Sequence, residues 1–176
     1  MTEPTTPATL PDTIDTVAGL RAGDPAAALR RTRDKVRLHT QLSEAALFDP
    51  ALPGLSLAER LHAARYVAHR SHAHALAATY RARLLNEGGN THDIAHADDD
   101  AFDALPRRLG AILAHARRVT LAPAEASAAD LAALKAAGLT TPAIVALSQL
   151  VAFVAYQLRV VAAVQALQTR IAKEAA

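Results

Sequence analysis

Four side chains near the middle of the sequence belong to types that move protons or attack a carbonyl: Glu59, His62, Ser71 and His74. A carboxylate and an imidazole held together can act as a general acid–base pair on a small carbonyl or lactone substrate. A serine beside a histidine can act as a nucleophile, although a three-residue spacing on a helix does not by itself indicate one. The residue types therefore point first to acid–base catalysis and only second to nucleophilic catalysis.

The same region supports a purely structural interpretation. Ser56-Leu57-Ala58-Glu59 has the capping-box spacing, in which the serine hydroxyl and the glutamate carboxylate satisfy free amides at the start of a helix. Neither Gly nor Pro interrupts residues 59–87, so this stretch is either one long helix or two helices with an unmarked break. In one straight helix Glu59 and Ser71 would lie about 18 Å apart, at 1.5 Å per residue, and could not cooperate.

The eight histidines also raise the question of a metal site. His69 and His72 are three residues apart, and His92 and His96 are four apart beside several aspartates. Two histidines at positions i and i+4 can share one metal ion when the segment is helical. We expect residues 88–103 to form a polar surface loop instead, so adventitious Zn or Ni binding is favoured over a dedicated site, and no metal and no cofactor are expected.

Four further residues are possible pocket residues, although core or interface packing is the commoner role for their types; these are Thr40, Ser43, Phe153 and Tyr156.

The composition indicates a helical protein and excludes several chemistries. The 176 residues include 44 alanines but only three Tyr, three Phe and no Trp, so stacking platforms for nucleic acid are nearly absent. There is no cysteine, which excludes disulfides, cysteine–metal sites and thiol catalysis. The formal net charge is only +2, and no segment alternates with period two. We therefore expect an all-α protein that binds no nucleic acid.

Capping signals and helix breakers divide the chain into elements. Asp12 and Gly19 bound a short helix, and Asp24-Pro25 opens a helix expected to run to about Phe48 with its basic residues on a solvated face. Later helices are expected over residues 59–87, 105–119, 127–137 and 141–173. We expect an N-terminal arm with a short helix over residues 1–24, its first ten residues mobile, and a single helical domain over residues 25–176.

The last expected helix is apolar around much of its circumference between Ile144 and Val161. Ser148, Gln149 and Gln157 interrupt its most apolar part, so we expect a buried core or interface helix rather than a membrane span. A surface this apolar in a chain of this size predicts a homo-oligomer: a dimer, trimer or hexamer. The first 25 residues lack a basic region followed by an apolar one, so a cytoplasmic protein is expected.

Two stretches together resemble the carboxymuconolactone decarboxylase/AhpD-like superfamily, in particular its peroxidase-related alkylhydroperoxidase branch. They are LSLAERLHAARYVAHRSHAHALAATYRARLL and LGAILAHARRVTLAPAEASAADLAALKAAGLTTPAIVALSQLVAFVAYQLRVVAAV. The resemblance covers roughly residues 30–167. It implies an AhpD-like all-helical fold, with a helical hairpin and a long apolar C-terminal helix, that assembles into homo-oligomers.

The chemical motif of that family is only partly present. The family spacing is Glu, eleven residues, Cys, two residues, Cys, three residues, His; laid from Glu59, it reaches Ser71, His74 and Ala78. Only the glutamate matches. The family peroxidases use a thiolate and then a disulfide, and neither a hydroxyl nor an imidazole can replace these. The resemblance therefore implies a relative of enzymes of antioxidant defence that is not itself a thiol peroxidase.

If the hairpin of the family is kept, Glu59 faces Ala78, and Glu59, His62 and His74 line one pocket with Ser71 nearer the turn. We then expect Glu59 to form an ion pair with His62 or His74, because a lone carboxylate would lose its hydration there.

Three functions remain open at this stage. The first is a scaffold whose thiol centre has been lost and which keeps a small-molecule pocket. The second is a cofactor-independent decarboxylase or isomerase using Glu59 with a histidine, and the third is a structural partner of a cysteine-containing paralogue.

Overall fold

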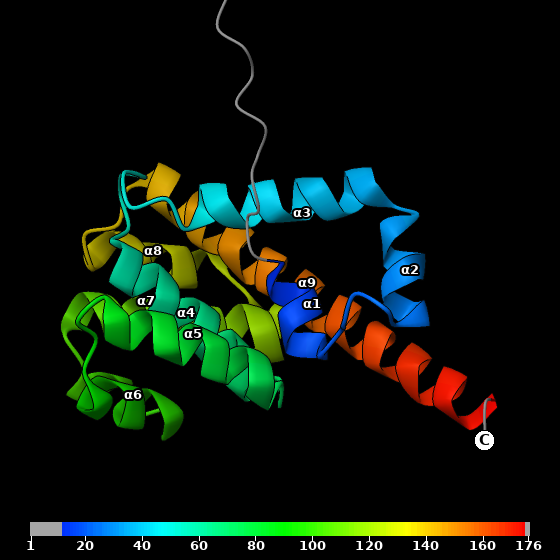
Figure 1. The fold of residues 1–176 in the computed structure, drawn as a ribbon. Coiled ribbons are helices and arrows are strands. Elements are labelled where there is room, and N and C mark those ends of the chain that lie inside the picture. Colours follow the sequence, from blue (N-terminus) through cyan, green and yellow to red (C-terminus); the bar gives the residue numbers. More distant parts are fainter. Residues whose placement is uncertain (1–11, 175–176) are drawn as a thin grey trace, which may run out of the picture. The chain divides into compact units, whose positions relative to one another are not determined.

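The computed structural model describes residues 12–174, and every regular element in this part of the chain is helical (Figure 1). The expectation of an all-α protein is confirmed. The elements are α1 Thr13–Ala18, α2 Pro25–Arg31, α3 Asp34–Leu47, α4 Leu57–Arg70, α5 His74–Asn86, α6 Thr91–Asp98, the 3₁₀ turn η1 Phe102–Ala104, α7 Arg107–Leu121, the 3₁₀ turn η2 Pro123–Glu125, α8 Ala128–Ala136 and α9 Thr141–Glu174.

The described residues divide into two compact units. Leu47–Arg159 form one unit, and the residues before Leu47 and after Arg159 form the other, so α9 contributes to both. We expected a single domain over residues 25–176. The division into two compact units does not test this expectation, which stays a prediction. The Thr/Pro-rich first ten residues, expected to be mobile, lie outside the described part of the chain.

The core of the unit Leu47–Arg159 is built around α4, which packs against α5, α6 and α7. Every residue from Arg60 to Ala68 is buried, so α4 presents no solvent face over more than two turns. Its alanines let neighbouring helices approach closely, while Leu61, Tyr66 and Val67 fill the space between them. This packing fixes the position of every side chain that α4 carries.

The stretch from Glu59 to Glu87 is a hairpin, not one long helix. Ser71 caps α4, and His72 has a left-handed backbone with φ of 58°, which reverses the chain without a glycine. Figure 1 shows α4 and α5 lying side by side. Because the turn is centred near His72, Glu59 at the start of α4 faces the end of α5 rather than Ala78, as the expected pairing had it.

Several helix boundaries form at the capping residues that the sequence indicates. Asp12 accepts a hydrogen bond from the Asp15 amide, and Ser56–Glu59 and Ser127–Asp130 both form capping boxes. Gly19 and Gly138 have positive φ at the ends of α1 and α8, where a glycine costs least. Local chemistry alone is therefore enough to place these ends.

Two expected elements differ in the structure. The helix expected from Pro25 to Phe48 is broken between α2 and α3, where the Thr32 hydroxyl donates to the Leu29 carbonyl at 2.7 Å. The loop expected over residues 88–103 contains α6 and η1. Asn90 caps α6, and Ile94 and Ala97 are buried where α6 packs on α4. Tertiary burial thus makes a helix of a segment whose composition favours a loop.

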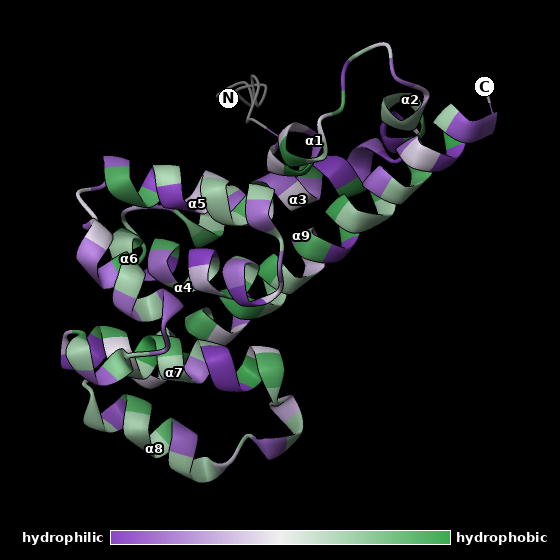
Figure 2. Cartoon of the chain, turned by 90° about the horizontal axis from the view of Figure 1, so that it is seen from below, coloured by the Kyte–Doolittle hydropathy of each residue, from purple (hydrophilic) through white to green (hydrophobic). Residues whose placement is uncertain are grey.

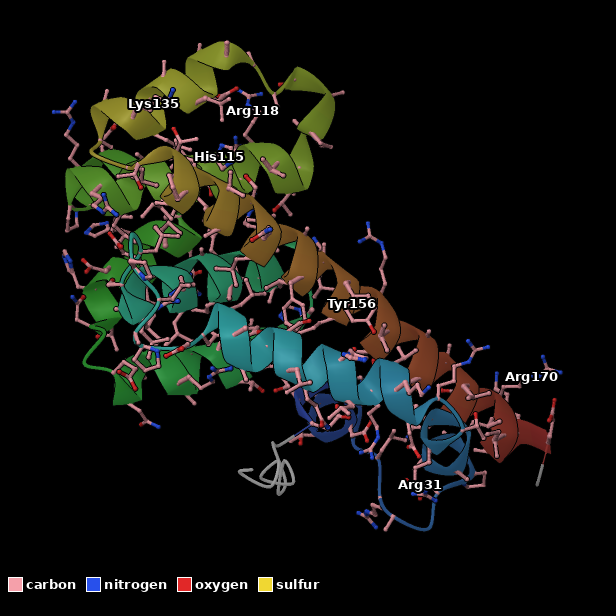
Figure 3. The ribbon with its side chains drawn as sticks, turned by 90° about the horizontal axis from the view of Figure 1, so that it is seen from above. Arg31, His115, Arg118, Lys135, Tyr156 and Arg170 are labelled. Carbon is pink, nitrogen blue, oxygen red and sulfur yellow. The ribbon has the colours of Figure 1, made fainter. Side chains whose placement is uncertain are left out.

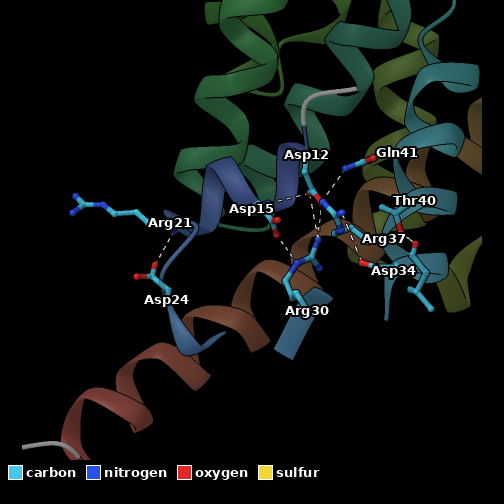
Figure 4. Close-up of polar contacts among 10 residues, drawn as sticks. Asp12, Asp15, Arg21, Asp24, Arg30, Asp34, Arg37, Thr40 and Gln41 are labelled. Carbon is cyan, nitrogen blue, oxygen red and sulfur yellow. Dashed lines mark hydrogen bonds and ion pairs between the residues drawn. The ribbon is translucent and has the colours of Figure 1, made fainter. Parts of the chain in front are cut away.

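A polar cluster joins α1 to α2 and α3 within the other unit (Figure 4). The Asp12 carboxylate accepts from Arg30 at 3.0 Å and from Gln41 at 3.2 Å, and Arg30 also pairs with Asp15. Burial, reinforced by the Asp12 charge, raises the pKa of Asp15 above its usual value. The sequence suggested that Arg30 belongs to a solvated basic face. In the structure it forms ion pairs with Asp12 and Asp15 instead.

Apolar residues recur along α9 (Figure 2). The length and composition of α9 are sufficient for a membrane-crossing helix, although we expected this segment to be too short and too polar. The core helix of a soluble protein passes the same test. Leu147, Leu150 and Val154 are buried, whereas Val145 is 51% exposed and Tyr156 37% exposed. The helix thus has one buried face, and its exposed large apolar side chains among the described residues are Val145 and Tyr156.

Candidate functional site

Glu59 is fully engaged in holding helices together. One carboxylate oxygen accepts from the Ser56 amide at 2.8 Å, and the other from the Arg108 Nε at 2.7 Å. Arg108 also donates to the carbonyls of Gly54 and Gly138. Glu59 is thus the centre of a clamp between the start of α4, α7 and the loop after α8, in which each of its carboxylate oxygens already accepts one hydrogen bond.

The predicted ion pair between Glu59 and a histidine is not formed. His62 is buried, and its Nδ1 has no hydrogen-bond partner among the described residues. Burial, helped by the positive charge of Arg65, lowers the pKa of His62 below its usual value. The imidazole is therefore neutral, and Glu59 obtains its positive partner from Arg108 instead.

Ser71 and His74 lie at the hairpin turn, far from Glu59. Twelve residues of helix separate Glu59 from Ser71, which corresponds to about 18 Å. His74 is exposed at the start of α5, with its ring 6.4 Å from that of His72. The structure does not gather the four predicted site residues into one pocket, and a catalytic role for any of them stays a prediction.

A groove along α7 offers a better site. A cavity of about 230 Å³ lies between α7, η1 and α8; its lining residues are Phe102, Ala111, Ala114, His115, Arg117, Arg118, Asp130 and Ala133. A second cavity of about 470 Å³ shares Phe102, Ala111 and Ala114 with the first and extends toward Asp103 and Arg107. Because they share a wall, the two form one groove, which we call the α7 groove.

The small residues of α7 explain why this groove exists. Gly110 lets η1 approach so closely that a Cβ at this position would lie 2.5 Å from the Phe102 carbonyl oxygen. Ala111 and Ala114 add only methyl groups to the floor, while Phe102 packs edge-on against Tyr66 with ring centroids 5.6 Å apart. The groove therefore has an apolar floor and one aromatic wall.

His115 is the unusual residue of the groove (Figure 3). It is only 7% exposed, and neither ring nitrogen has a hydrogen-bond partner among the described residues. Burial lowers the pKa of its imidazole below the usual value, and the nearby Asp130 carboxylate opposes this shift without reversing it. A neutral imidazole keeps one donor and one acceptor, so His115 brings unused hydrogen-bonding capacity to the wall of a cavity.

The charges around His115 are already paired. Asp130 accepts from the backbone amide and the hydroxyl of Ser127, which lowers the pKa of its carboxyl. Arg118 pairs with Glu125 and lies 3.8 Å from Asp130, and Arg117 donates to Asp100 at 3.0 Å. The charged side chains at the rim therefore already have partners of opposite charge.

Asp100 holds the other end of the groove together. Its carboxylate accepts from the Tyr66 hydroxyl at 2.5 Å and from Arg117, and pairs with Arg70 at 3.5 Å. Burial would raise its pKa, but these donors outweigh it, and the pKa of Asp100 lies below the usual value. Its φ of 56° is a left-handed conformation that aspartate tolerates better than most residues. Asp100 thus anchors the segment that carries Phe102.

The sequence interpretation missed His115 because this residue has no partner motif. Leu109, Ile112, Leu113 and Ala116 form the apolar stripe of α7, and His115 adjoins that stripe. A single histidine beside the buried face of an amphipathic helix is the one signal that was present. The unpaired state of its nitrogens depends on α8 and η1, which no local pattern specifies.

The remaining predicted residues lie outside the groove. The Thr40 hydroxyl donates to the Val36 carbonyl within α3, and Phe153 and Tyr156 have ring centroids 6.3 Å apart on α9. Ser43 is exposed on α3. Among residues 12–174, no group of three or more His, Asp and Glu side chains is arranged to hold a metal ion.

Comparison of the chain with models of known protein families and with curated proteins gives no match.

Proposed function

We propose that this protein is a cysteine-free scaffold of the carboxymuconolactone decarboxylase/AhpD-like type that binds a small organic molecule in the α7 groove. In this proposal it is a cytoplasmic homo-oligomer related to the alkylhydroperoxidases of antioxidant defence that performs no thiol chemistry. The order of a capped helical hairpin, a further helix pair and a long apolar helix supports the family part of the proposal.

The binding part rests on one observation: His115 is buried at a cavity wall with both ring nitrogens unpaired. A buried polar group without a partner costs about 1–3 kcal/mol, so the fold maintains an unfavourable arrangement at this position. A ligand that presents a carbonyl or carboxylate oxygen to the ring N–H of His115 would recover part of that cost. The ring nitrogens are closed off from water, so binding also requires a small displacement of the groove wall.

The lining indicates the chemical class of the ligand. Phe102, Ala111 and Ala114 favour an apolar body, and His115 favours a carbonyl or carboxyl group at one end. A volume of about 230 Å³ suits a molecule with a single ring. A small cyclic acid or lactone satisfies these requirements.

A second candidate, a cofactor-independent decarboxylase or isomerase, is favoured by the position of His115 and Asp130 on the wall of one cavity. A neutral imidazole beside a fixed carboxylate can accept a proton from a carbon acid. In this version His115 replaces Glu59 as the base, because both oxygens of Glu59 are occupied. Loss of turnover in His115→Gln with ligand binding retained would separate this candidate from the scaffold.

Two neighbouring alanines of α8 provide a matched test of binding. Ala133 lines the groove and Ala132 does not, while both are exposed. With benzoate and γ-butyrolactone as probes, we expect Ala133→Leu to weaken binding at least about tenfold and Ala132→Leu to leave it unchanged. The His115 ring resonances should shift with either probe. Equal affinity in both variants would place the ligand elsewhere.

The purified protein should show no thiol-dependent reduction of an alkyl hydroperoxide, because the chain contains no cysteine. The measurement is peroxide consumption with dithiothreitol, after chelation of metals and with haem absent. Turnover above the buffer rate under these conditions would contradict this part of the proposal.

A further inference from the structure

The helix α6 presents two histidines that meet at one point. His92 and His96 are four residues apart, and their Nε2 atoms lie 3.1 Å from each other. The two rings are nearly perpendicular, with an interplanar angle of 85° and centroids 4.2 Å apart. Without a metal ion this contact is a hydrogen bond that requires opposite tautomers at the two Nε2 atoms.

The fold holds this pair on a fixed backbone. The Asn90 side chain accepts from the Asp93 amide at 2.7 Å and donates to the Asp93 carboxylate at 2.8 Å, which caps α6. Ile94 and Ala97 are buried where α6 packs on α4, so the helix is anchored through the residues between and beside the histidines. The helical form required for an i, i+4 pair is therefore present, which the expected surface loop would not have provided.

We propose that His92 and His96 bind one divalent cation of the late first-row transition metals, with Zn²⁺ as its representative. Two imidazole nitrogens about 2.0–2.1 Å from a tetrahedral zinc ion lie about 3.3–3.4 Å apart. The observed 3.1 Å is close to this separation. Rotation of the exposed His92 ring directs both Nε2 lone pairs at the ion, and each ring then carries its proton on Nδ1.

Imidazole ligands select the metal class. Neutral nitrogen ligands suit Zn, Cu and Ni, whereas Mg and Ca prefer oxygen ligands. Since the described residues supply no third ligand at this point, water completes the coordination and leaves positions open to an added donor. The site is independent of the α7 groove, and its failure would not affect the proposed function.

Isothermal titration calorimetry of the full chain with Zn²⁺ tests the proposal. We expect one zinc ion per chain and an affinity loss of at least about tenfold in His92→Ala and in His96→Ala. His39→Ala, which removes an exposed histidine of α3, should bind as the wild type does. Affinity equal to the wild type in either α6 variant would overturn the proposal and leave an adventitious ion only.

A variant that keeps the number of histidines tests the geometry itself. In Thr91→His/His96→Ala the imidazoles occupy adjacent positions, about 100° apart around the helix, and cannot converge on one ion. We expect this variant to lose the same affinity as His96→Ala. Retention of wild-type affinity would show that histidine count rather than spacing decides binding. Circular dichroism of each variant verifies that the helices remain.

Discussion

The buried histidines make the stability of this protein depend on pH. For His115 and His62, burial lowers the pKa in the folded state, while the unfolded chain titrates near the ordinary value of about 6.5. Between these two values the unfolded state binds more protons, so the free energy of unfolding falls as the pH decreases. Above about pH 6.5 both states are neutral and this contribution to the pH dependence disappears.

Replacing His115 by leucine should remove part of that dependence. We expect His115→Leu to lose less stability than the wild type between about pH 7.5 and about pH 5.5, with His62 supplying the remaining slope. At about pH 7.5 the variant should be no less stable, because it deletes two unpaired nitrogens. Urea unfolding at the two pH values measures both effects, and an unchanged slope would contradict a neutral, buried imidazole.

Arg60 carries a buried charge whose hydrogen bonds, among the described residues, go to backbone carbonyls. It is 1% exposed and donates to the carbonyls of Leu47 at 3.1 Å and Asp49 at 2.8 Å, fixing the turn before α4. Lysine keeps the charge, but its compact ammonium group lacks the planar set of donors with which the guanidinium group of Arg60 contacts both carbonyls. We expect Arg60→Lys to cost about 2 kcal/mol by urea unfolding.

The control for Arg60 is Arg170, which is 78% exposed and pairs with Glu174 within α9. Arg170→Lys should change stability by less than about 0.5 kcal/mol. Equal effects of the two substitutions would mean that the fork geometry of Arg60 is not required.

At the scale of elements, the close approach of η1 to α7 determines the groove. Alanine normally stabilises a helix interior relative to glycine by about 1 kcal/mol. At Gly110 the added methyl would meet the Phe102 carbonyl, which belongs to backbone and cannot rotate away. We therefore expect Gly110→Ala to destabilise by about 1–3 kcal/mol, opposite in sign to the helix propensity.

Gly23 is the matched control for Gly110, because nothing lies within 4 Å of a Cβ at that position. Gly23→Ala should be neutral or slightly stabilising in thermal unfolding. A stabilising Gly110→Ala would show that η1 does not contact α7 as closely as the structure has it.

At the scale of the whole molecule, the exposed side chains of Val145 and Tyr156 on α9 support the proposal of a homo-oligomer. Val145 is half exposed on this helix, and Gln165 is exposed on a different face of it. We expect the wild type to sediment as a dimer, trimer or hexamer. A charge at Val145 would be buried in the interface, so Val145→Glu should shift the population toward monomer.

Gln165→Glu adds the same charge at an exposed polar position of α9 about 160° around the helix from Val145, and should leave the assembly intact. Sedimentation velocity at micromolar concentration distinguishes the three proteins. A wild-type protein that is monomeric under these conditions would contradict the homo-oligomer.

The amino-acid sequence by itself determined the features that depend on neighbours in the chain. The all-α class follows from alanine-rich, strand-free patterning, and the starts of α1, α4 and α8 follow from side chains that cap amides three residues away. The absence of thiol chemistry follows from composition alone. Each of these is a local or compositional property, so no knowledge of packing was needed.

Only the tertiary structure decided which polar groups meet. Arg108 pairs with Glu59, which lies 49 positions away in the sequence. His115 is buried with both ring nitrogens unpaired, and α6 is a helix whose Ile94 and Ala97 are buried. These outcomes depend on the free energy of burial and pairing between distant segments, which spacing along the chain does not encode. For that reason the sequence did not show that Glu59 pairs with Arg108, or that a cavity lies along α7.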